Sequence, residues 1–407
     1  MKIIPRAEHH ISRKLVDTNA LKVLYRLAKS GYDAYLVGGC VRDLLLNHRP
    51  KDFDVVTNAK PEEVKKIFSN CRIIGRRFRL AHVYFKDGIV EVATFRAGHN
   101  AEEPHHGRTE SGLIVRDNVY GTIEEDAWRR DFTINALYYN IKDFSVVDFT
   151  HGYQDLKEGK LRVLGDPETR YREDPVRIIR AIRIASKLEM KIVKKSAAPI
   201  IPLSNLLDKI SSSRLFDEVV KLFHTGHASQ VLPALLQYKL FSILFPPVAA
   251  LFNEKEGKAT KQLLTIACSD TDKRINDGKS ISCAFLFAFL LWMPVEKLTR
   301  ELHEDGHPIM EALQLASKAI LDEQSKVTAL PRRFISSIHD IWHLQFQLPR
   351  SKSKSIYRCL ENSRFRAGFD LLLLRSKVDD NLKPLVEWWT EFQQANASKQ
   401  KKLLDQF

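Results

Sequence analysis

Residues 35–57 read YLVGGCVRDLLLNHRPKDFDVVT, and this stretch decides the fold. The pattern predicts a strand, a turn at the glycine pair, a short helix, and a second strand that holds Asp52 and Asp54. Successive side chains of a strand alternate between its two faces, so both carboxylates lie on one face while Phe53 points to the core. Two converging carboxylates offer the oxygen ligands that Mg²⁺ prefers. The stretch therefore predicts an oxygen-rich site for Mg²⁺.

The glycine pair supplies the second part of this site. Gly38 and Gly39 let backbone N–H groups approach a phosphate chain closely, and Arg42 in the following helix is a partner for phosphate. Together with the carboxylates, these residues are the parts of a nucleotidyl-transfer site that uses two metal ions. Each motif alone has an ordinary explanation, because a Gly-Gly pair is usually a turn and an Asp-x-Asp pair is usually a solvated strand end.

The joint order of these motifs resembles the nucleotidyltransferase head of the family that contains class II tRNA nucleotidyltransferases and bacterial poly(A) polymerases. The resemblance implies an α+β head with a small mixed sheet and helices, followed by an all-α neck and body. We expect the head over residues 1–148, the neck with a base-recognition motif over 149–240, and a helical RNA-binding body over 241–407. The last strand is expected at residues 146–149, so that helices follow from there.

Composition agrees with a polyanionic partner. The 407 residues include 64 Lys and Arg against 50 Asp and Glu, which leaves a net charge of +14. The five cysteines are scattered without a C-x-x-C pair, so we expect reduced thiols in a cytoplasmic protein, with neither a zinc site nor a disulfide framework. The longest apolar run, residues 283–294, is too short to span a bilayer and predicts a buried helix, so no transmembrane segment is expected.

Residues 124–140, EEDAWRRDFTINALYYN, are predicted to form one helix on which Asp131 and Asn135 share a face. A surface helix with ion pairs would show the same pattern. The segment also matches the family's second motif, R-R-D-x-T-x-N. The resemblance implies that Arg129 and Arg130 hold a triphosphate, while Asp131 and Asn135 face the ribose and the catalytic centre.

A further carboxylate, Glu91, lies in a predicted hairpin formed by residues 80–85 and 89–96. If the second strand of the hairpin pairs with the strand after Asp54, Glu91 joins the carboxylate pair. If it does not, Glu91 is a solvent-facing residue of an edge strand. The sequence leaves open whether Glu91 or Asp131 is the third active-site carboxylate.

Residues 171–188, YREDPVRIIRAIRIASKL, predict a helix that opens at Asp174 and the proline after it. The ordinary explanation of this pattern is an aspartate that caps the helix, followed by proline at the first helical position. Glu173, Asp174 and Arg177 also match the family's E-D-x-x-R motif, in which the Asp and the Arg read the Watson–Crick edge of the incoming base. Arg180 lies on the same side and is expected to contact the nucleotide as well. Such a pair suits adenine or cytosine, so it does not separate an A-adding from a CCA-adding enzyme.

That separation rests on residues 73–85, IIGRRFRLAHVYF, which resemble the stretch that marks poly(A) polymerases within the family. The resemblance covers nearly the whole chain. It implies a template-independent enzyme that uses two Mg²⁺ ions to add AMP from ATP to RNA 3′ ends, with a role in RNA polyadenylation and decay and with RNA-decay machinery as a candidate partner.

Two alternatives stand beside this expectation. One is a CCA-adding tRNA nucleotidyltransferase, which would share every catalytic residue. The other, of a different class, is a non-catalytic RNA-binding protein on a transferase fold. The intact pair of Asp52 and Asp54 argues against the second alternative, because the loss of a carboxylate would mark a dead site.

The basic segment 349–366 is a candidate RNA contact, with Lys352, Lys354 and Arg358 beside aromatic residues. A solvated helix face explains the same residues. Family members often end in a long basic tail, whereas this chain stops at KKLLDQF. We therefore expect the folded body to carry more of the RNA contact.

Overall fold

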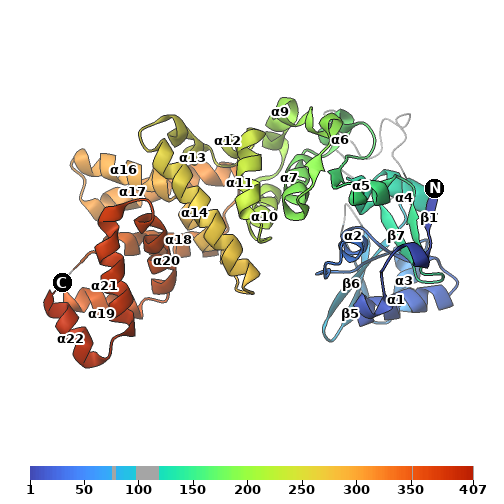
Figure 1. The fold of residues 1–407 in the computed structure, drawn as a ribbon, viewed down its shortest axis with the longest axis horizontal. Helices are drawn as coiled ribbons and strands as arrows, with labels where there is room; N and C mark the ends of the chain where they lie inside the picture. The colour runs from blue at the N-terminus through green and yellow to red at the C-terminus, as the bar shows by residue number, and fades with distance from the viewer. Residues whose placement is uncertain (76–78, 98–118, 351, 407) are drawn as a thin grey trace. The chain divides into compact units, whose positions relative to one another are not determined.

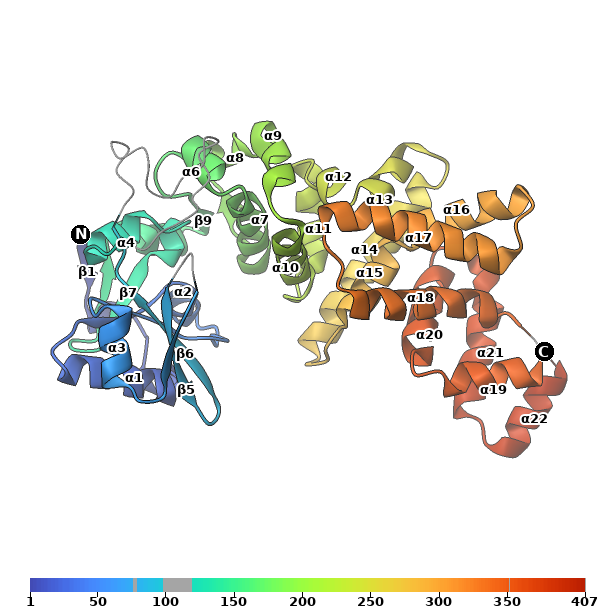
Figure 2. The same ribbon diagram turned by 180° about the vertical axis from the view of Figure 1, so that it is seen from behind.

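The computed structural model describes residues 1–75, 79–97, 119–350 and 352–406, and the chain divides into two compact units (Figures 1 and 2). The first unit comprises Met1–Leu203 and the second Ser204–Phe407. The first contains an α+β head and the second is helical, which confirms the expected fold class. The finer division into head, neck and body stays a prediction.

A mixed eight-stranded sheet forms the centre of the first unit, in the order β1-β8-β7-β2-β3-β6-β5-β4. Strands β3 and β6 run parallel, and the other neighbours run antiparallel. The strands are β1 (Lys2–Ile4), β2 (Ala34–Val37), β3 (Asp54–Thr57), β4 (Cys71–Ile74), β5 (Leu80–Phe85), β6 (Gly88–Thr94), β7 (Leu137–Asn140) and β8 (Val146–Asp148). The hairpin β5–β6 confirms the one predicted from the sequence.

Helices of the first unit cover the sheet and continue beyond it. They are α1 (Thr18–Lys29), α2 (Gly39–Leu45), α3 (Pro61–Ile67), α4 (Ile123–Trp128), α5 (Gly152–Lys157), α6 (Pro167–Glu173), α7 (Val176–Leu188), α8 (Lys194–Ala197) and α9 (Ile200–Leu203), with the 3-10 helices η1 (Arg6–Glu8), η2 (Arg13–Leu15) and η3 (Thr133–Asn135). Helices α1 and α3 pack against the sheet side by side (Figure 1). Val56 of β3 and Tyr138 of β7 belong to a buried hydrophobic cluster that also includes Ala127 of α4.

Two expectations about strands and helices are wrong. Residues 124–140 do not form one helix: α4 ends at Trp128, η3 follows, and β7 begins at Leu137 in the centre of the sheet. The strand at Val146 is not the last, because β9 (Lys160–Leu161) and β10 (Lys191–Ile192) form a small parallel pair. Both short strands lack the alternating pattern that identifies a strand in a sequence.

The second unit is built from packed helices. They are η4 (Ser204–Lys209), α10 (Ser212–Phe223), α11 (Ala228–Gln237), α12 (Phe241–Leu244), α13 (Pro246–Ala250), η5 (Leu251–Asn253), α14 (Gly257–Asn276), α15 (Cys283–Leu290), α16 (Trp292–Glu304), α17 (Ile309–Val327), α18 (Arg332–Gln347), α19 (Ser353–Glu361), α20 (Phe365–Ser376), η6 (Asp380–Leu382), α21 (Lys383–Gln394) and α22 (Ala397–Gln406).

Tryptophans anchor the core of this second unit. The side chains of Trp342 and Trp389 are fully buried, and their indole N–H groups donate to the carbonyl oxygens of Ala288 and Leu348 at 2.9 and 3.0 Å. A buried tryptophan needs such a partner for its polar edge. The apolar run around α15 is buried as expected, and no helix in the described ranges is long and apolar enough to cross a membrane.

Candidate active site

The glycine turn between β2 and α2 is the point from which the site is built. Gly38 has a φ of 79°, a left-handed conformation that favours glycine. A Cβ atom on Gly38 would lie 3.4 Å from Nη1 of Arg130 and 3.9 Å from Oδ2 of Asp54. The turn therefore brings backbone, guanidinium and carboxylate together, and phosphate binding at the turn stays a prediction.

Strand pairing places Glu91 beside Asp54. In the parallel pair β3–β6, Val55 is opposite Val92, so the preceding residues Asp54 and Glu91 are also aligned. Strand β6 lies between β3 and β5, so the expected alternative of an edge strand is wrong, although the Glu91 side chain is exposed as that alternative held. Across the next pair, Nε2 of His82 lies 3.4 Å from Oε1 of Glu91. His82, Glu91 and Asp54 thus occupy neighbouring positions on three adjacent strands.

Negative charge is concentrated at Asp54. Burial and the charges of Glu91 and Asp52 together raise the pKa of Asp54 to about 6, against the opposing charge of Arg130. The carboxylate keeps an exposed face, so a ligand can reach it. Among the residues that the structure describes, no three carboxylate, histidine or cysteine side chains converge closely enough to form a complete metal site. The expected metal ligands therefore stay the two carboxylates, Asp52 and Asp54.

A cluster of arginines extends from the glycine turn through Arg130. Arg130 donates to Oδ2 of Asp126 at 2.9 Å and to the hydroxyl of Tyr138 at 3.1 Å, and this hydroxyl donates to the same carboxylate oxygen at 2.8 Å. Burial and the nearby charges of four further arginines together lower the pKa of Arg129 to about 9: Arg96, Arg130, Arg170 and Arg177. This accumulation of positive charge favours a polyanion such as a triphosphate.

Asp131 and Asn135 are brought together by a turn. The amide of Asn135 donates to Oδ1 of Asp131 at 3.1 Å and accepts from Nη1 of Arg42 at 2.6 Å. Arg180 donates from Nε to Oδ2 of Asp131 at 2.8 Å. Although burial opposes ionisation of Asp131, Arg180 and the amide of Asn135 outweigh it and lower the pKa of the carboxyl to about 2. Asp131 is therefore ionised and forms an ion pair with Arg180 of α7.

The E-D-x-x-R motif lies at the joint between α6 and α7. Asp174 ends α6, and α7 begins at Val176 after Pro175, so Asp174 does not cap α7 as the sequence suggested. Nη1 of Arg177 donates to the carbonyl oxygen of Arg170 at 2.7 Å and to Oε2 of Glu173 at 3.3 Å. These contacts hold the Arg177 guanidinium in place, and its contact with a base stays a prediction.

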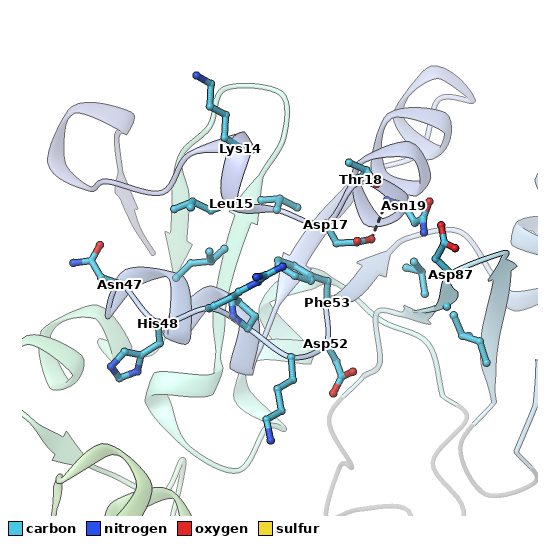
Figure 3. A pocket seen from close by; sticks show the side chains of 18 residues that line it. Lys14, Leu15, Asp17, Thr18, Asn19, Asn47, His48, Asp52, Phe53 and Asp87 are labelled. Carbon is cyan, nitrogen blue, oxygen red and sulfur yellow. Dashed lines mark hydrogen bonds between the residues drawn. The ribbon is translucent and has the colours of Figure 1, made fainter. Parts of the chain in front are cut away.

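A pocket of about 860 Å³ adjoins Asp52 (Figure 3). It is bounded by the segment before α1, the loop between α2 and β3, and the turn between β5 and β6. Phe53 was expected to point to the core, and Asp52 was expected on the same strand as Asp54, but β3 begins only at Asp54, and the partly buried Phe53 lines the pocket beside Asp52. The side chains of Lys14 and His48 lie around the pocket (Figure 3). The pocket leaves space next to one of the two predicted metal ligands.

Other predicted residues are placed as follows. Lys352 comes directly before α19, Lys354 and Arg358 lie on this helix, and all three side chains are exposed, opposite the buried Ile356 and Cys359. They belong to the second unit. Residues 76–78 of the stretch that marks poly(A) polymerases lie outside the described residues.

Several residues of the site were missed by sequence reasoning. They are Arg96, Asp126, Tyr138, Arg170, His82, Asp43 and Lys187. The spacing of four between Asp126 and Arg130 was a usable signal for one ion pair. Asp43 also binds its sequence neighbour Arg42, whereas the contacts that bring the others to the site join residues beyond helical spacing and depend on strand register and helix packing.

The fold and this site define a nucleotidyltransferase. Family models support this class over three parts of the chain: the Poly A polymerase head domain matches residues 34–162, the probable RNA and SrmB-binding site of polymerase A matches 189–252, and the polymerase A arginine-rich C-terminus matches 305–407.

Among curated proteins, the Poly(A) polymerase I of Salmonella typhi is 48% identical, with 100% of this chain and 89% of that protein covered. The Poly(A) polymerase I of Haemophilus influenzae is 46% identical, with 99% and 90% covered. The chain belongs to the poly(A) polymerase I family. The CCA-adding enzyme of Lactobacillus helveticus is 37% identical over only 54% of this chain and 53% of its own.

Solved structures of CCA-adding enzymes share the fold. The enzyme of Bacillus stearothermophilus, in complex with CTP, superposes with a TM-score of 0.62 at 25% identity, covering 90% of this chain and 80% of that one. An apo CCA-adding enzyme reaches a TM-score of 0.65 at 21% identity, covering 98% and 89%.

Proposed function

We propose that this chain is a template-independent poly(A) polymerase that adds AMP from ATP to RNA 3′ ends. The observation that carries the proposal is the glycine turn at Gly38, which brings the carboxylate of Asp54 and the guanidinium of Arg130 to one place. The relatives that are 46–48% identical over nearly the whole chain are named Poly(A) polymerase I, which supports adenylate as the added nucleotide.

The donor set fits divalent magnesium. Asp52 and Asp54 provide hard carboxylate oxygens, and the alignment of Glu91 with Asp54 across the β3–β6 pair adds negative charge, which supports a cation there. Two Mg²⁺ ions held by Asp52 and Asp54 would activate the RNA 3′-hydroxyl and neutralise the departing pyrophosphate.

Protein groups would then hold the substrates in line. The N–H groups of the glycine turn and the guanidinium groups of Arg129 and Arg130 bind the triphosphate. The RNA 3′ oxygen attacks the α-phosphorus, and the bond from that phosphorus to the pyrophosphate oxygen breaks. The pocket beside Asp52 provides room for the terminal nucleotide of the RNA.

Base selection is assigned to Asp174 and Arg177 at the start of α7. Glu173 and the carbonyl of Arg170 already orient the Arg177 guanidinium, which lowers the entropy lost when it binds a base edge. A role of the tails in RNA decay, and contacts with decay machinery, stay predictions.

The test uses the purified chain with Mg²⁺, labelled ATP and an RNA oligomer without secondary structure. We expect adenosine addition by the wild type and a loss of about a hundredfold or more in Asp54→Ala, because transition-state charge would lose its metal-bound partner. Asp208→Ala, at an exposed carboxylate in η4, is the matched control. An Asp54→Ala enzyme as fast as this control would refute the assignment.

A further inference from the structure

A chain of contacts between six polar side chains begins and ends on α7 and joins it to α2 and to the segment after α4, so that the side chains and α7 together form a ring. Four of its members, Arg42, Asn135, Asp131 and Arg180, were described above. Asp43 and Lys187 complete the ring: Nε and Nη2 of Arg42 donate to Oδ1 of Asp43 at 2.8 and 2.6 Å, and Nζ of Lys187 donates to Oδ2 of Asp43 at 3.3 Å. No motif in the sequence assigned a role to Asp43 or Lys187.

The ring attaches α7 at two points. Arg180 and Lys187 are seven residues apart, which is two helical turns, so both side chains leave α7 on the same side. Arg180 is bound to Asp131, and Lys187 is bound to Asp43. A helix held at one point can pivot about it, whereas a second attachment about 10 Å along the axis fixes its direction.

Because Asp43 and Arg42 are buried, the second attachment depends on the Lys187 ammonium. Asp43 is 7% exposed and Arg42 is 6% exposed, so their charges have little access to water. Oδ1 of Asp43 is occupied by Arg42, and Oδ2 accepts from Lys187. Removing the Lys187 ammonium would leave a buried carboxylate oxygen without its partner, which favours a shift of Asp43 and of the arginine bound to it.

A shift of Arg42 or of α7 would change the geometry of the candidate active site. Arg42 lies against the glycine turn, because a Cβ atom on Gly39 would be 3.4 Å from Nη2 of Arg42. On α7, Arg177 precedes Arg180 by less than one helical turn. The direction of α7 therefore decides where Arg177 stands relative to the glycine turn.

We propose that Asp43 and Lys187 are positioning residues for nucleotide selection. They hold α7 in one direction, so that the base-reading pair meets the nucleotide in a single geometry. The inference rests on the proposed function, in which Arg177 reads the base and the glycine turn holds the triphosphate. Neither Asp43 nor Lys187 touches the nucleotide in this scheme.

The test compares Lys187→Met with Lys187→Arg, which keeps the charge. The matched control is Lys142→Met, since Lys142 forms a 2.8 Å ion pair with Asp33 in the same unit but outside the ring. Affinities for ATP and for CTP are measured by direct titration with Mg²⁺, and KM, kcat and the melting temperature are measured beside them.

We expect Lys187→Met to weaken ATP binding and raise KM for ATP about fivefold, the size of effect that a partly exposed ion pair supports. The preference for ATP over CTP should fall by a similar factor, while kcat stays near that of the control. Lys187→Arg should restore the preference. Asp43→Asn combined with Lys187→Met should be no worse than the more damaging single variant, because both remove one contact.

Equal affinities and equal ATP preference in Lys187→Met and Lys142→Met would overturn the proposal. A lower melting temperature without a change in preference would overturn it as well, since that is a purely structural role. If the wild type bound ATP but failed to extend RNA, the proposed function would fail, and the titrations would still decide the role of the ring. A wild type that bound neither nucleotide would overturn both.

Discussion

The carboxylate of Asp54 lies where burial and the charges of Glu91 and Asp52 oppose its ionisation and raise its pKa to about 6. A carboxyl group whose pKa is raised on folding destabilises the native state once the pH rises above its ordinary value of 3.8, and the effect is complete above the raised value. We therefore expect Asp54→Asn to abolish nucleotide addition and, in the presence of a chelator, to leave the melting temperature unchanged or higher.

Thermal denaturation with and without Mg²⁺ checks this prediction. The wild type should gain stability from Mg²⁺ and Asp54→Asn should gain less, because binding to the native state alone stabilises it. Asp208→Asn serves as the control. A lower melting temperature of Asp54→Asn in chelator would show that Asp54 supports the fold, which contradicts the assignment.

The pKa of Asp131 is shifted in the opposite direction from that of Asp54. Its pKa falls to about 2 because Arg180 and Asn135 outweigh the effect of burial, so its contribution to stability is complete above about pH 4 and is lost as the pH falls towards 2. Asp131→Asn should cost about 2 kcal/mol at pH 7. Urea denaturation at pH 7 and pH 3 measures this cost, which should shrink at pH 3. A cost independent of pH would mean that the ion pair with Arg180 contributes nothing.

For single residues, the sequence was a better guide to which residue types gather at the site. It was a poorer guide to which atoms their side chains contact. Arg42 was expected to bind phosphate, yet in the structure its donors engage Asp43 and Asn135. The arginine is 6% exposed, and a buried guanidinium needs such acceptors. Its contact with a nucleotide stays a prediction.

Among the elements, the segment 124–140 shows why part of the fold was missed. The spacing of four between Asp131 and Asn135 is typical of a helix face, but a turn after α4 creates the same contact through one hydrogen bond. Strand β7 then runs through the centre of the sheet, where both faces are covered and alternation of polar and apolar residues disappears. Strand β6, which alternates, was predicted correctly.

Helix α19 supplies a prediction at the same scale. If Lys352, Lys354 and Arg358 bind RNA phosphates, replacing all three with Ala should reduce the slope of log affinity against log salt by about 2, since each phosphate contact on a single strand contributes about 0.7. The matched control replaces the exposed Lys2, Lys22 and Lys29 of the first unit with Ala, which removes the same charge. Equal slopes in the two triple variants would assign α19 to a solvated face.

For the whole molecule, what the sequence predicted correctly was the order of an α+β part followed by a helical part. The change from strands to long helices is visible in the chain, whereas the division at Leu203 and Ser204 falls within a run of short helices. Nothing in periodicity marks a boundary there, because the boundary depends on which helices pack against each other.

The final prediction concerns the product that the whole molecule makes. With ATP alone, the chain should extend an unstructured RNA oligomer by many adenosines, and CTP should be a poor substrate. A CCA-adding enzyme must change from C to A and then stop, which requires more than one base-reading geometry. The ring that holds α7 at Asp131 and Asp43 favours a single geometry.

The assay offers each labelled nucleotide separately, with Mg²⁺, to the oligomer and to a tRNA that lacks its terminal CCA. Product lengths on a sequencing gel distinguish the two enzymes, and Asp54→Ala shows the background. Long adenosine tails on both RNAs are the expected result. Addition of two cytidines and one adenosine to the tRNA, with no growth beyond that and no tail on the oligomer, would contradict poly(A) synthesis while leaving nucleotidyl transfer at Asp54 intact.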